Sequence, residues 1–435
     1  MAEICPFRGI RYNRETIEDL AQVTCPPYDV ITPQQQEHYY EKSDYNVIRL
    51  EYPLPVVTAK QSIHRKYSEA ALTFQRWLGE GVLQVEDYPA FYIHDHWFTF
   101  LGEKRRRRGV IARVKLEPWG NNIYPHEETF SKAKNDRLQL MRACQANFSP
   151  LFALYQDSEG KIGKILAEAS QGEPIMKFAG SGENHVVWAV TEPEFACQVS
   201  EFLAAQPLYM ADGHHRYETA LAYQRERAHI ITSEARQSLT GKEAFNYVMM
   251  TLVDFSDPGL VIFPVHRLVR GIASSALARL EGQLEQAFTL ESVPLTENLV
   301  SSLKYKMIGG ALLGVLGLVP QSLILLKECH GVSFEDLMRK NHSLSYKNFG
   351  VSLLNHLILD RMLGVAQDSE DIAYAVDVEA AWQGIKEKKY QLAFLLSSPP
   401  PEIIKTVADA KDRMPRKSTY FHPKLPTGLI INPLA

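Results

Sequence analysis

PLYMADGHHRYETALAYQRER, residues 207–227, joins a short apolar segment to a segment of helical composition. In the second segment, Tyr217, Ala220 and Leu221 recur at the spacing of one helix face. Asp212 and Gly213 are turn and cap residues at the junction. The stretch therefore predicts a strand that leads directly into a helix, with five polar residues at the start of the helix: Asp212, Gly213, His214, His215 and Arg216.

The start of this helix is suited to binding an anion. The first backbone N–H groups of a helix have no intrahelical partner, and the helix dipole is positive there. Gly213 would let the backbone approach a phosphate closely, and Arg216 would offer a guanidinium fork. Asp212 could cap the helix or hold a magnesium-bound water. In the alternative interpretation, Asp212 only caps the helix, and the histidines and the arginine make surface or interdomain bonds.

A second polar cluster lies at the head of another predicted helix, in the stretch YPHEETFSKAKNDR, residues 124–137. A carboxylate near a phosphate site can take the proton of an attacking hydroxyl, and histidine or arginine can stabilise the charge on the leaving group. The candidate catalytic or binding residues of this cluster are His126, Glu127, Glu128, Thr129 and Arg137.

Two further segments carry candidate residues. In TCPPYDVITP, residues 24–33, Asp29 could ligate magnesium or orient a substrate amine, or it could be a plain turn residue. In MPRKSTYFHPKLPTG, residues 414–428, Lys417 and Lys424 could contact a phosphorylated ligand, or the segment could be a surface tail.

The bulk composition indicates a soluble globular protein of more than one domain. The chain has 435 residues, of which 45% are hydrophobic and 23% charged, with a formal net charge of −4. Five scattered cysteines without C-x-x-C spacing, and a first segment without a signal-peptide pattern, favour the cytoplasm. The charge favours neither nucleic acid nor a membrane as a partner. Homo-oligomerisation is left open.

Two segments could mislead an interpretation. Residues 308–326, IGGALLGVLGLVPQSLILL, are almost long enough to span a bilayer, but Pro320, Gln321 and Ser322 interrupt them. We expect two buried strands joined by a turn. The arginine run in GEKRRRRG, residues 102–109, could bind nucleic acid, but a solvated hairpin turn is the expected structure.

The chain is expected to be of the α/β (α+β) class in three parts. An N-terminal α/β region would cover residues 1–105, a nucleotide-binding core residues 106–268 with an insertion at 157–200, and a C-terminal α/β region residues 269–435. No P-loop, no G-x-G-x-x-G after a strand, no H-E-x-x-H and no G-x-S-x-G occurs, which excludes the common forms of several enzyme classes.

Over nearly its whole length the chain resembles the bacterial domain-of-unknown-function 1015 family. The matching stretches are PFRGIRYN, PPYDVI, YNVIRLEYP, HEETFSKAKNDRL, ADGHHRYETAL, DPGLVIFPVHRLV and MPRKSTYFHPKLPTGL.

The central part also resembles the ParB-like fold, which includes the sulfiredoxins and the free-serine kinases. Those kinases read Pro-His-Glu before one helix and Asp-Gly-His-His-Arg at the start of a later one. This chain has the same two motifs in the same order, at residues 125–127 and 212–216. The resemblance implies a ParB/sulfiredoxin-like core that binds nucleotide phosphates at 212–216, and it implies that Glu127 is the base for a serine hydroxyl.

The sequence thus leads to the hypothesis of a phosphotransferase that uses ATP or ADP with magnesium, for which Asp212 is the candidate ligand. Free L-serine or a similar metabolite would be the acceptor. Phosphoryl transfer asks a protein mainly for positioning and charge neutralisation, which two such clusters could supply. The alternative is a nucleotide-binding regulatory or ParB-like binding protein without kinase activity. A third hypothesis is an ATPase or acyl-phosphate activity on another acceptor.

Overall fold

The computed structural model describes residues 2–54, 62–128, 131–230, 240–303, 307–329, 333–334, 342–347 and 349–435. Its contacts divide the chain into two compact units. Unit one consists of Met1–Pro125, Thr129–Leu260 and Pro423–Ala435, and unit two of His126–Glu128 and Val261–His422. The three-part division expected from the sequence stays a prediction, and residue 105, its first boundary, lies inside a strand.

Unit one is built on a mixed sheet of nine strands among the described residues. Its order is β6-β11-β8-β12-β5-β4-β10-β9, with β1 beside β5. The pairs β11/β6 and β12/β8 are parallel and the other pairs are antiparallel. The strands are β1 (Ile4–Cys5), β4 (Phe91–Phe100), β5 (Glu103–Lys115), β6 (Ile123–Tyr124), β8 (Leu151–Tyr155), β9 (Met176–Gly180), β10 (Glu183–Val190), β11 (Leu208–Asp212) and β12 (Tyr247–Asp254).

Two-stranded pairings complete this unit. They join β2 (Ile10–Tyr12) with β3 (Leu83–Val85) and β7 (Ala146–Asn147) with β21 (Asn432–Pro433).

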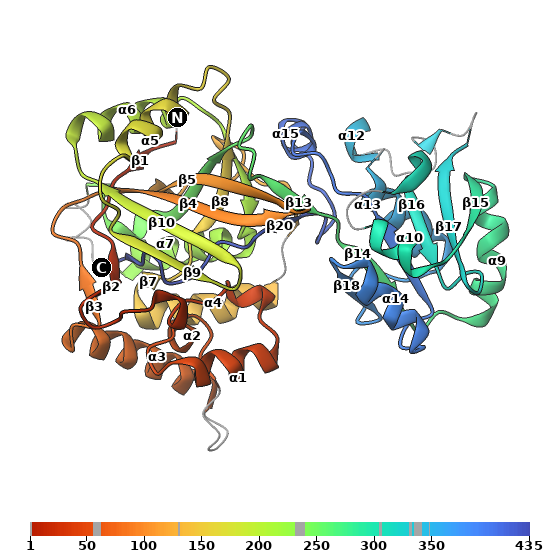
Figure 1. Ribbon diagram of the computed structural model, residues 1–435, viewed down its shortest axis with the longest axis horizontal. Coiled ribbons are helices and arrows are strands. Elements are labelled where there is room, and N and C mark those ends of the chain that lie inside the picture. The colour runs from red at the N-terminus through yellow and green to blue at the C-terminus, as the bar shows by residue number, and fades with distance from the viewer. Residues whose placement is uncertain are drawn as a thin grey trace. The chain divides into compact units, whose positions relative to one another are not determined.

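Helices cover both faces of this sheet (Figure 1). The helices α1 to α4 lie along one side, and α5 and α6 lie on the other. Because side chains alternate along a strand, Phe91 and Ile93 belong to one hydrophobic cluster and Tyr92 to another. The helices are α1 (Pro33–Lys42), α2 (Ile48–Glu51), α3 (Ser62–Gly79), α4 (Ser131–Cys144), α5 (Lys161–Ala169), α6 (Pro193–Ala204) and α7 (His214–Ile230), with 3-10 turns η1 (Leu20–Gln22), η2 (Tyr28–Val30) and η3 (Ala244–Asn246).

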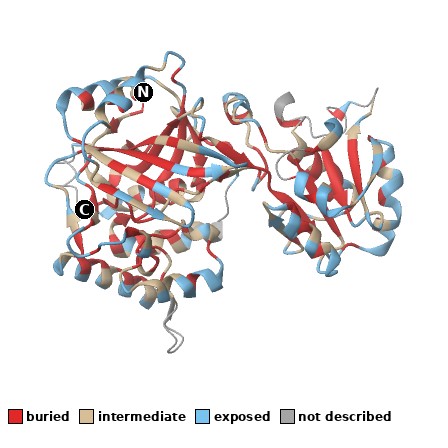
Figure 2. Cartoon of the chain, in the orientation of Figure 1, coloured by how far each residue is buried: buried red, intermediate tan, exposed pale blue. Residues whose placement is uncertain are grey.

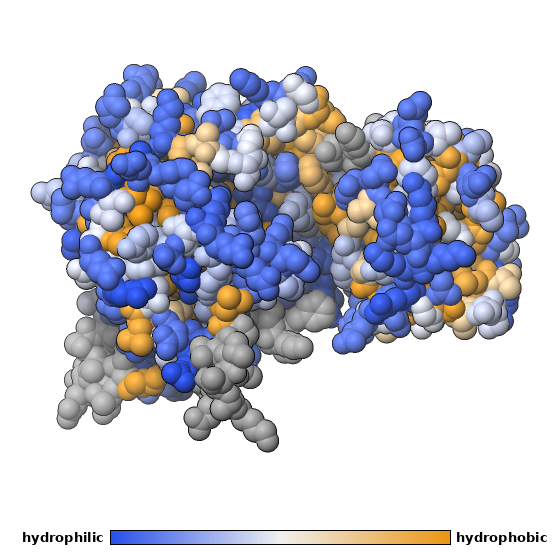
Figure 3. Space-filling view, turned by 60° about the horizontal axis from the view of Figure 1, so that its bottom comes forward, coloured by the Kyte–Doolittle hydropathy of each residue, from blue (hydrophilic) through white to orange (hydrophobic). Residues whose placement is uncertain are grey.

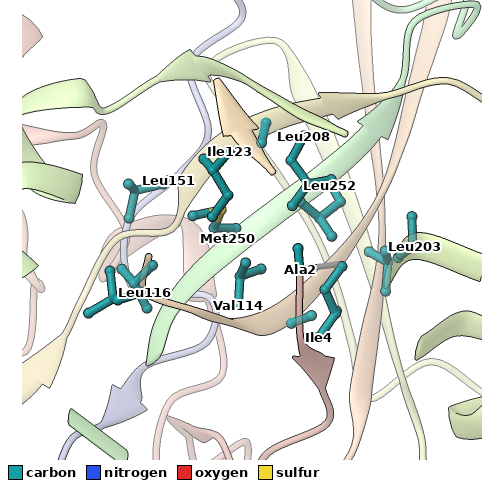
Figure 4. Close-up of a cluster of buried hydrophobic side chains, with 14 of the residues drawn as sticks. Ala2, Ile4, Val114, Leu116, Ile123, Leu151, Leu203, Leu208, Met250 and Leu252 are labelled. Atoms are coloured by element: carbon teal, nitrogen blue, oxygen red, sulfur yellow. The ribbon is translucent and has the colours of Figure 1, made fainter. Parts of the chain in front are cut away.

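The first cluster shows how distant segments make one core (Figure 4). Val114 of β5 and Met250 of β12 lie beside Ile123, Leu203 and Leu208, and all five are buried. Full burial of each such aliphatic side chain contributes about 1.5–3 kcal/mol. This core holds the strand that ends at Asp212 rigidly in the sheet.

Unit two contains a six-stranded, fully antiparallel sheet in the order β15-β17-β16-β19-β14-β18, within the described residues. Its strands are β14 (His266–Val269), β15 (Phe288–Pro294), β16 (Leu313–Leu316), β17 (Ser322–Glu328), β18 (Ile372–Ala375) and β19 (Leu392–Leu396), and a separate pair joins β13 (Val261–Phe263) to β20 (Tyr420–His422). The helical segments are α9 (Ser274–Glu285), α10 (Glu297–Ser302), η4 (Ile308–Gly310), α12 (Leu344–Lys347), α13 (Gly350–Ser352), η5 (Leu353–Met362, a π-helix), α14 (Val378–Lys386) and α15 (Glu402–Asp409).

The structure confirms the α/β class and the interpretation of residues 308–326. The antiparallel strand β16 and most of β17 lie in this segment, and Leu313–Leu316 are buried. No helix in the described part of the chain is long and apolar enough to span a membrane. Buried residues concentrate in the strands of each sheet (Figure 2), and the face seen in Figure 3 is largely hydrophilic with small apolar groups between.

The prediction for the arginine run is wrong. The chain reverses at Leu101 and Gly102, which have positive φ, and all four arginines lie in β5. Alternation along this strand turns Arg107 inward, where only 1% of the residue is exposed. The run is therefore not a solvated turn.

Candidate active site

The β11–α7 junction has the strand–glycine–helix form expected from the sequence. The strand β11 ends at Asp212 and α7 begins at His214, with the Gly213 carbonyl accepting from Tyr217 N at 2.9 Å. Gly213 has a φ of +95°, which side chains rarely allow. A Cβ at this position would lie 3.2 Å from Leu151 Cγ and from a guanidinium nitrogen of Arg216. The backbone conformation thus favours glycine strongly, and the space for a side chain is tight.

Arg216 is buried in this junction and is hydrogen-bonded to the protein. One of its terminal nitrogens donates to Ser149 Oγ and to the Pro150 carbonyl, both at 2.9 Å. Burial opposes its charge, yet the carboxylates of Asp212, Asp29 and Glu51 raise the pKa of Arg216. Neighbouring carboxylates thus already place negative charge around the guanidinium that the sequence analysis expected to bind a phosphate. Phosphate binding by this guanidinium stays a prediction.

Glu51 links Arg216 to a second buried arginine. Only 3% of Glu51 is exposed, and its Oε1 accepts from Ser149 Oγ at 3.1 Å. Burial raises the pKa of Glu51 in spite of the positive charges of Arg137 and Arg216 and the Ser149 hydrogen bond. The same residues line a cavity of about 40 Å³. That space suits a water molecule and not a nucleotide.

Arg137, a predicted contact residue, is held on α4 by several partners. It donates to the Glu51 carbonyl at 2.5 Å and to Asp136 Oδ2 at 2.5 and 3.0 Å. Its guanidinium carbon also lies 4.1 Å from the ring centre of Tyr28. The structure therefore brings segment 24–33, α4 and α7 together in unit one.

Asp212 faces two cations. Lys424 Nζ donates to its Oδ2 at 3.1 Å, and a terminal nitrogen of Arg216 lies 3.8 Å from the same oxygen. The C-terminal lysine predicted from the sequence therefore does reach the loop. Both cations would repel a magnesium ion bound to this oxygen, and magnesium at Asp212 stays a prediction.

The remaining predicted residues of unit one lie around this loop. His214 is buried, with its ring centre 6.2 Å from that of Trp119. His215 is partly buried, and its carbonyl accepts from Thr219 Oγ1 at 2.8 Å. Asp29 lies in η2 and is exposed. Its negative charge is one of those that raise the pKa of Arg216.

Pro125 is the last residue of its segment in unit one, whereas His126 and Glu127 belong to unit two, where residues 417–419 anchor Glu127. Its carboxylate accepts from Ser418 N at 3.0 Å, Thr419 N at 3.0 Å, Thr419 Oγ1 at 2.9 Å and Lys417 N at 3.3 Å. His126 is fully buried, and its Nε2 lies 2.9 Å from Thr419 Oγ1.

This second cluster also unites two further predicted residues. Glu128 Oε2 lies 3.8 Å from Arg416 Nε. Lys417 has a φ of +57°, a strained conformation for a lysine, and contributes its backbone N–H to Glu127. Thr129 lies outside the described residues.

Sequence reasoning missed the residues that hold the two arginines. Glu51 lies within a mostly apolar segment and Ser149 precedes a proline, so neither carries a local pattern that indicates a site. Each is recognised only through contacts with α4 and α7. The inward position of Arg107 could have been predicted, because the alternation of inward and outward residues in VIARV, residues 110–114, extends towards the N-terminus through Arg107.

Comparisons with known proteins give these results. No curated protein matches the sequence. Among solved structures, a free serine kinase in complex with AMP is 10% identical, with a TM-score of 0.34 over 72% of this chain and 86% of the other. A conserved hypothetical protein from Pyrococcus furiosus is 12% identical, with a TM-score of 0.34 over 73% and 93%. SbnI from Staphylococcus aureus with a C-terminal truncation is 10% identical, with a TM-score of 0.33 over 73% and 85%.

The sequence match to a family is extensive. It runs from β1 through the 212–216 loop and into unit two. Six of the seven sequence stretches quoted above lie within this match, and the stretch at residues 414–429 lies beyond it. The chain belongs to the family described as "Protein of unknown function (DUF1015)", whose profile matches residues 4–352.

Proposed function

We propose that this protein is a nucleotide-dependent phosphotransferase acting on the hydroxyl of a small metabolite, with free L-serine as the first candidate. The donor would be ATP or ADP, accompanied by magnesium on its phosphates. The observation that carries the proposal is the β11–α7 junction. There Gly213, with a φ of +95°, immediately precedes a long helix, and Asp212 and the buried Arg216 lie on either side of it in the sequence. Such a junction can cradle phosphate oxygens with backbone N–H groups.

The charged groups around the junction suit this role. Lys424 and Arg216 both face Asp212, so a phosphate entering the loop would meet two cations that are already ordered. Preorganised cations stabilise the charge of a transferring phosphoryl group without further rearrangement. Glu127 is the proposed base, as the resemblance to serine kinases implies.

Replacement of Gly213 by alanine should weaken nucleotide binding in a protein that still folds. The added Cβ would press on Leu151 and Arg216 and would disfavour the left-handed backbone. Gly160 is a matched control, because it also has a positive φ (+64°) at the start of a helix but has open space around it.

Calorimetry with ATP and ADP on both variants measures this difference. A folded Gly213→Ala protein with the affinity of Gly160→Ala would argue against phosphate binding at the junction.

Arg216→Lys should lower the free energy of unfolding and weaken nucleotide binding. The lysine ammonium cannot reproduce both bonds to Ser149 and Pro150 together with the approach to Asp212. We expect a loss in binding of about 1.5–3 kcal/mol, the value of a hydrogen bond to a charged group. The exposed Arg225 on the same helix supplies the control variant Arg225→Lys. Reduced stability with unchanged nucleotide affinity would make Arg216 a purely structural residue.

The proposed activity is tested by incubating the purified chain with labelled ATP or ADP and a panel of hydroxylated metabolites. Label should move to L-serine or a close analogue in the presence of magnesium. Transfer to water or to a carboxylate instead would indicate an ATPase or acyl-phosphate activity.

A second candidate is a nucleotide-binding regulatory protein without kinase activity. It is favoured by the four hydrogen bonds that Glu127 accepts from residues 417–419, because a carboxylate anchored in this way suits a structural role. Nucleotide binding without any transfer, to any acceptor, would support this candidate.

A further inference from the structure

A buried cluster of imidazoles and one carboxylate lies on the adjacent strands β4 and β10 of unit one. His94 and His96 alternate along β4, so they occupy the same face of the sheet. In the antiparallel register His96 pairs with His185, and Glu183 lies two residues before His185 on β10. Strand pairing thus places H-x-H beside E-x-H.

Three of these side chains lie close enough together to bind one metal ion. One ligand atom from each of His96, Glu183 and His185 lies within 4.8 Å of the others, in a search of the described residues. His96 Nε2 is 2.6 Å from Glu183 Oε2, and His185 Nε2 is 3.8 Å from the same oxygen. The ligands would therefore need only small movements to surround one ion.

The two imidazoles of this cluster are shielded from water. His96 is 1% exposed and His185 5% exposed, whereas 27% of the Glu183 side chain reaches solvent. The carboxylate therefore marks the side from which an ion could enter.

We propose that His96, Glu183 and His185 form a binding site for a divalent transition-metal ion, with Zn²⁺ as the first candidate. Two imidazoles and one carboxylate are a recurrent ligand set of zinc, and they leave a coordination position for water or a substrate. The proposal does not depend on the phosphotransferase assignment.

Neighbouring side chains orient both histidines. His94 Nε2 lies 3.1 Å from His185 Nδ1, which turns His185 Nε2 towards Glu183. Arg107 donates to His96 Nδ1 at 3.1 Å and to the Pro423 carbonyl at 2.8 Å. Because arginine only donates, metal at His96 Nε2 requires the ring proton to move to Nδ1 and Arg107 to give up its bond to that nitrogen. Arg107 therefore competes with the metal, and the site should bind more weakly than a structural zinc site.

The experiment uses the full-length chain after removal of metals with a chelator. Titration with Zn²⁺ should reveal one equivalent of binding, and Co²⁺ should give visible d–d bands without a thiolate charge-transfer band. The absence of that band matters because Cys197 is exposed. Glu183→Gln and His185→Gln each remove a proposed direct ligand, so each should weaken binding by more than the roughly 10–100-fold typical of losing an outer-shell partner.

A matched control is His229→Gln, since His229 is exposed on α7 and outside the cluster. It should leave the affinity unchanged. The proposal is overturned by failure of the wild-type chain to bind Zn²⁺ and Co²⁺, by a thiolate-to-cobalt band, or by equal affinities in the wild type and both cluster variants. The Co²⁺ spectrum of the wild type decides the question even where a variant fails to fold.

Discussion

Glu127→Gln should lower the rate of phosphoryl transfer by about 10²–10⁴-fold, with nucleotide affinity little changed. Glutamine has the shape of glutamate but cannot accept a proton. Its carbonyl oxygen can keep the hydrogen bonds from Ser418 and Thr419, which now go to one carboxylate oxygen. The substitution would therefore remove the proposed base while retaining most of the local structure, and single-turnover rates measure the effect.

Glu128→Gln is the control for this variant. Glu128 is adjacent in sequence and about half of its side chain is exposed, with Arg416 3.8 Å away. It should retain nearly full activity if Glu127 is the base. Full activity in a folded Glu127→Gln protein would move the role to Glu128 or Asp29, or would end the kinase hypothesis.

Arg137→Leu should lower the free energy of unfolding by about 3–5 kcal/mol, because removing one partner leaves buried charge uncompensated. The variant would remove the cation nearest to the buried Glu51 and also the guanidinium stacked on Tyr28. Asp136 would lose its bond to the guanidinium and keep those from Lys66 and Tyr67. Urea unfolding monitored by circular dichroism measures the loss, as the difference in the free energy of unfolding between the variant and the wild type.

Arg142→Leu provides the comparison on the same helix. Arg142 pairs with Glu226 at the surface, where 42% and 33% of the two side chains are exposed. An exposed pair contributes about 0–1 kcal/mol, so this variant should be almost as stable as the wild type. Equal losses in the two variants would contradict the view that Arg137 anchors a buried network.

Local patterns predicted much of the secondary structure but few of the contacts. The β11–α7 junction was predictable because apolar strand residues, turn residues and a helix face follow each other within one short stretch. The pairing of β16 with β17 was predictable for the same reason. In contrast, Lys424 reaches Asp212 across 212 positions of sequence, and no local pattern determines which distant charge will arrive.

The buried networks were missed because they depend on strand pairing. HDH at residues 94–96 and ENH at 183–185 are visible in the sequence, but only the register of β4 with β10 makes them one cluster. Likewise, Glu51, Ser149 and Arg216 come from segments about 70 to 100 positions apart and meet through tertiary packing. The arginine run was misassigned because four like charges resemble a solvated turn, although the alternation of β5 continues through them.

Hydrogen exchange of the wild-type chain with and without nucleotide tests the central claim most directly, because it locates the bound phosphates on the backbone. The account predicts that saturating ATP or ADP slows exchange in the peptide that covers residues 208–217, where Asp212, Gly213 and the first turn of α7 lie. Nucleotide binding that protects other segments and leaves the exchange of this peptide unchanged would contradict it.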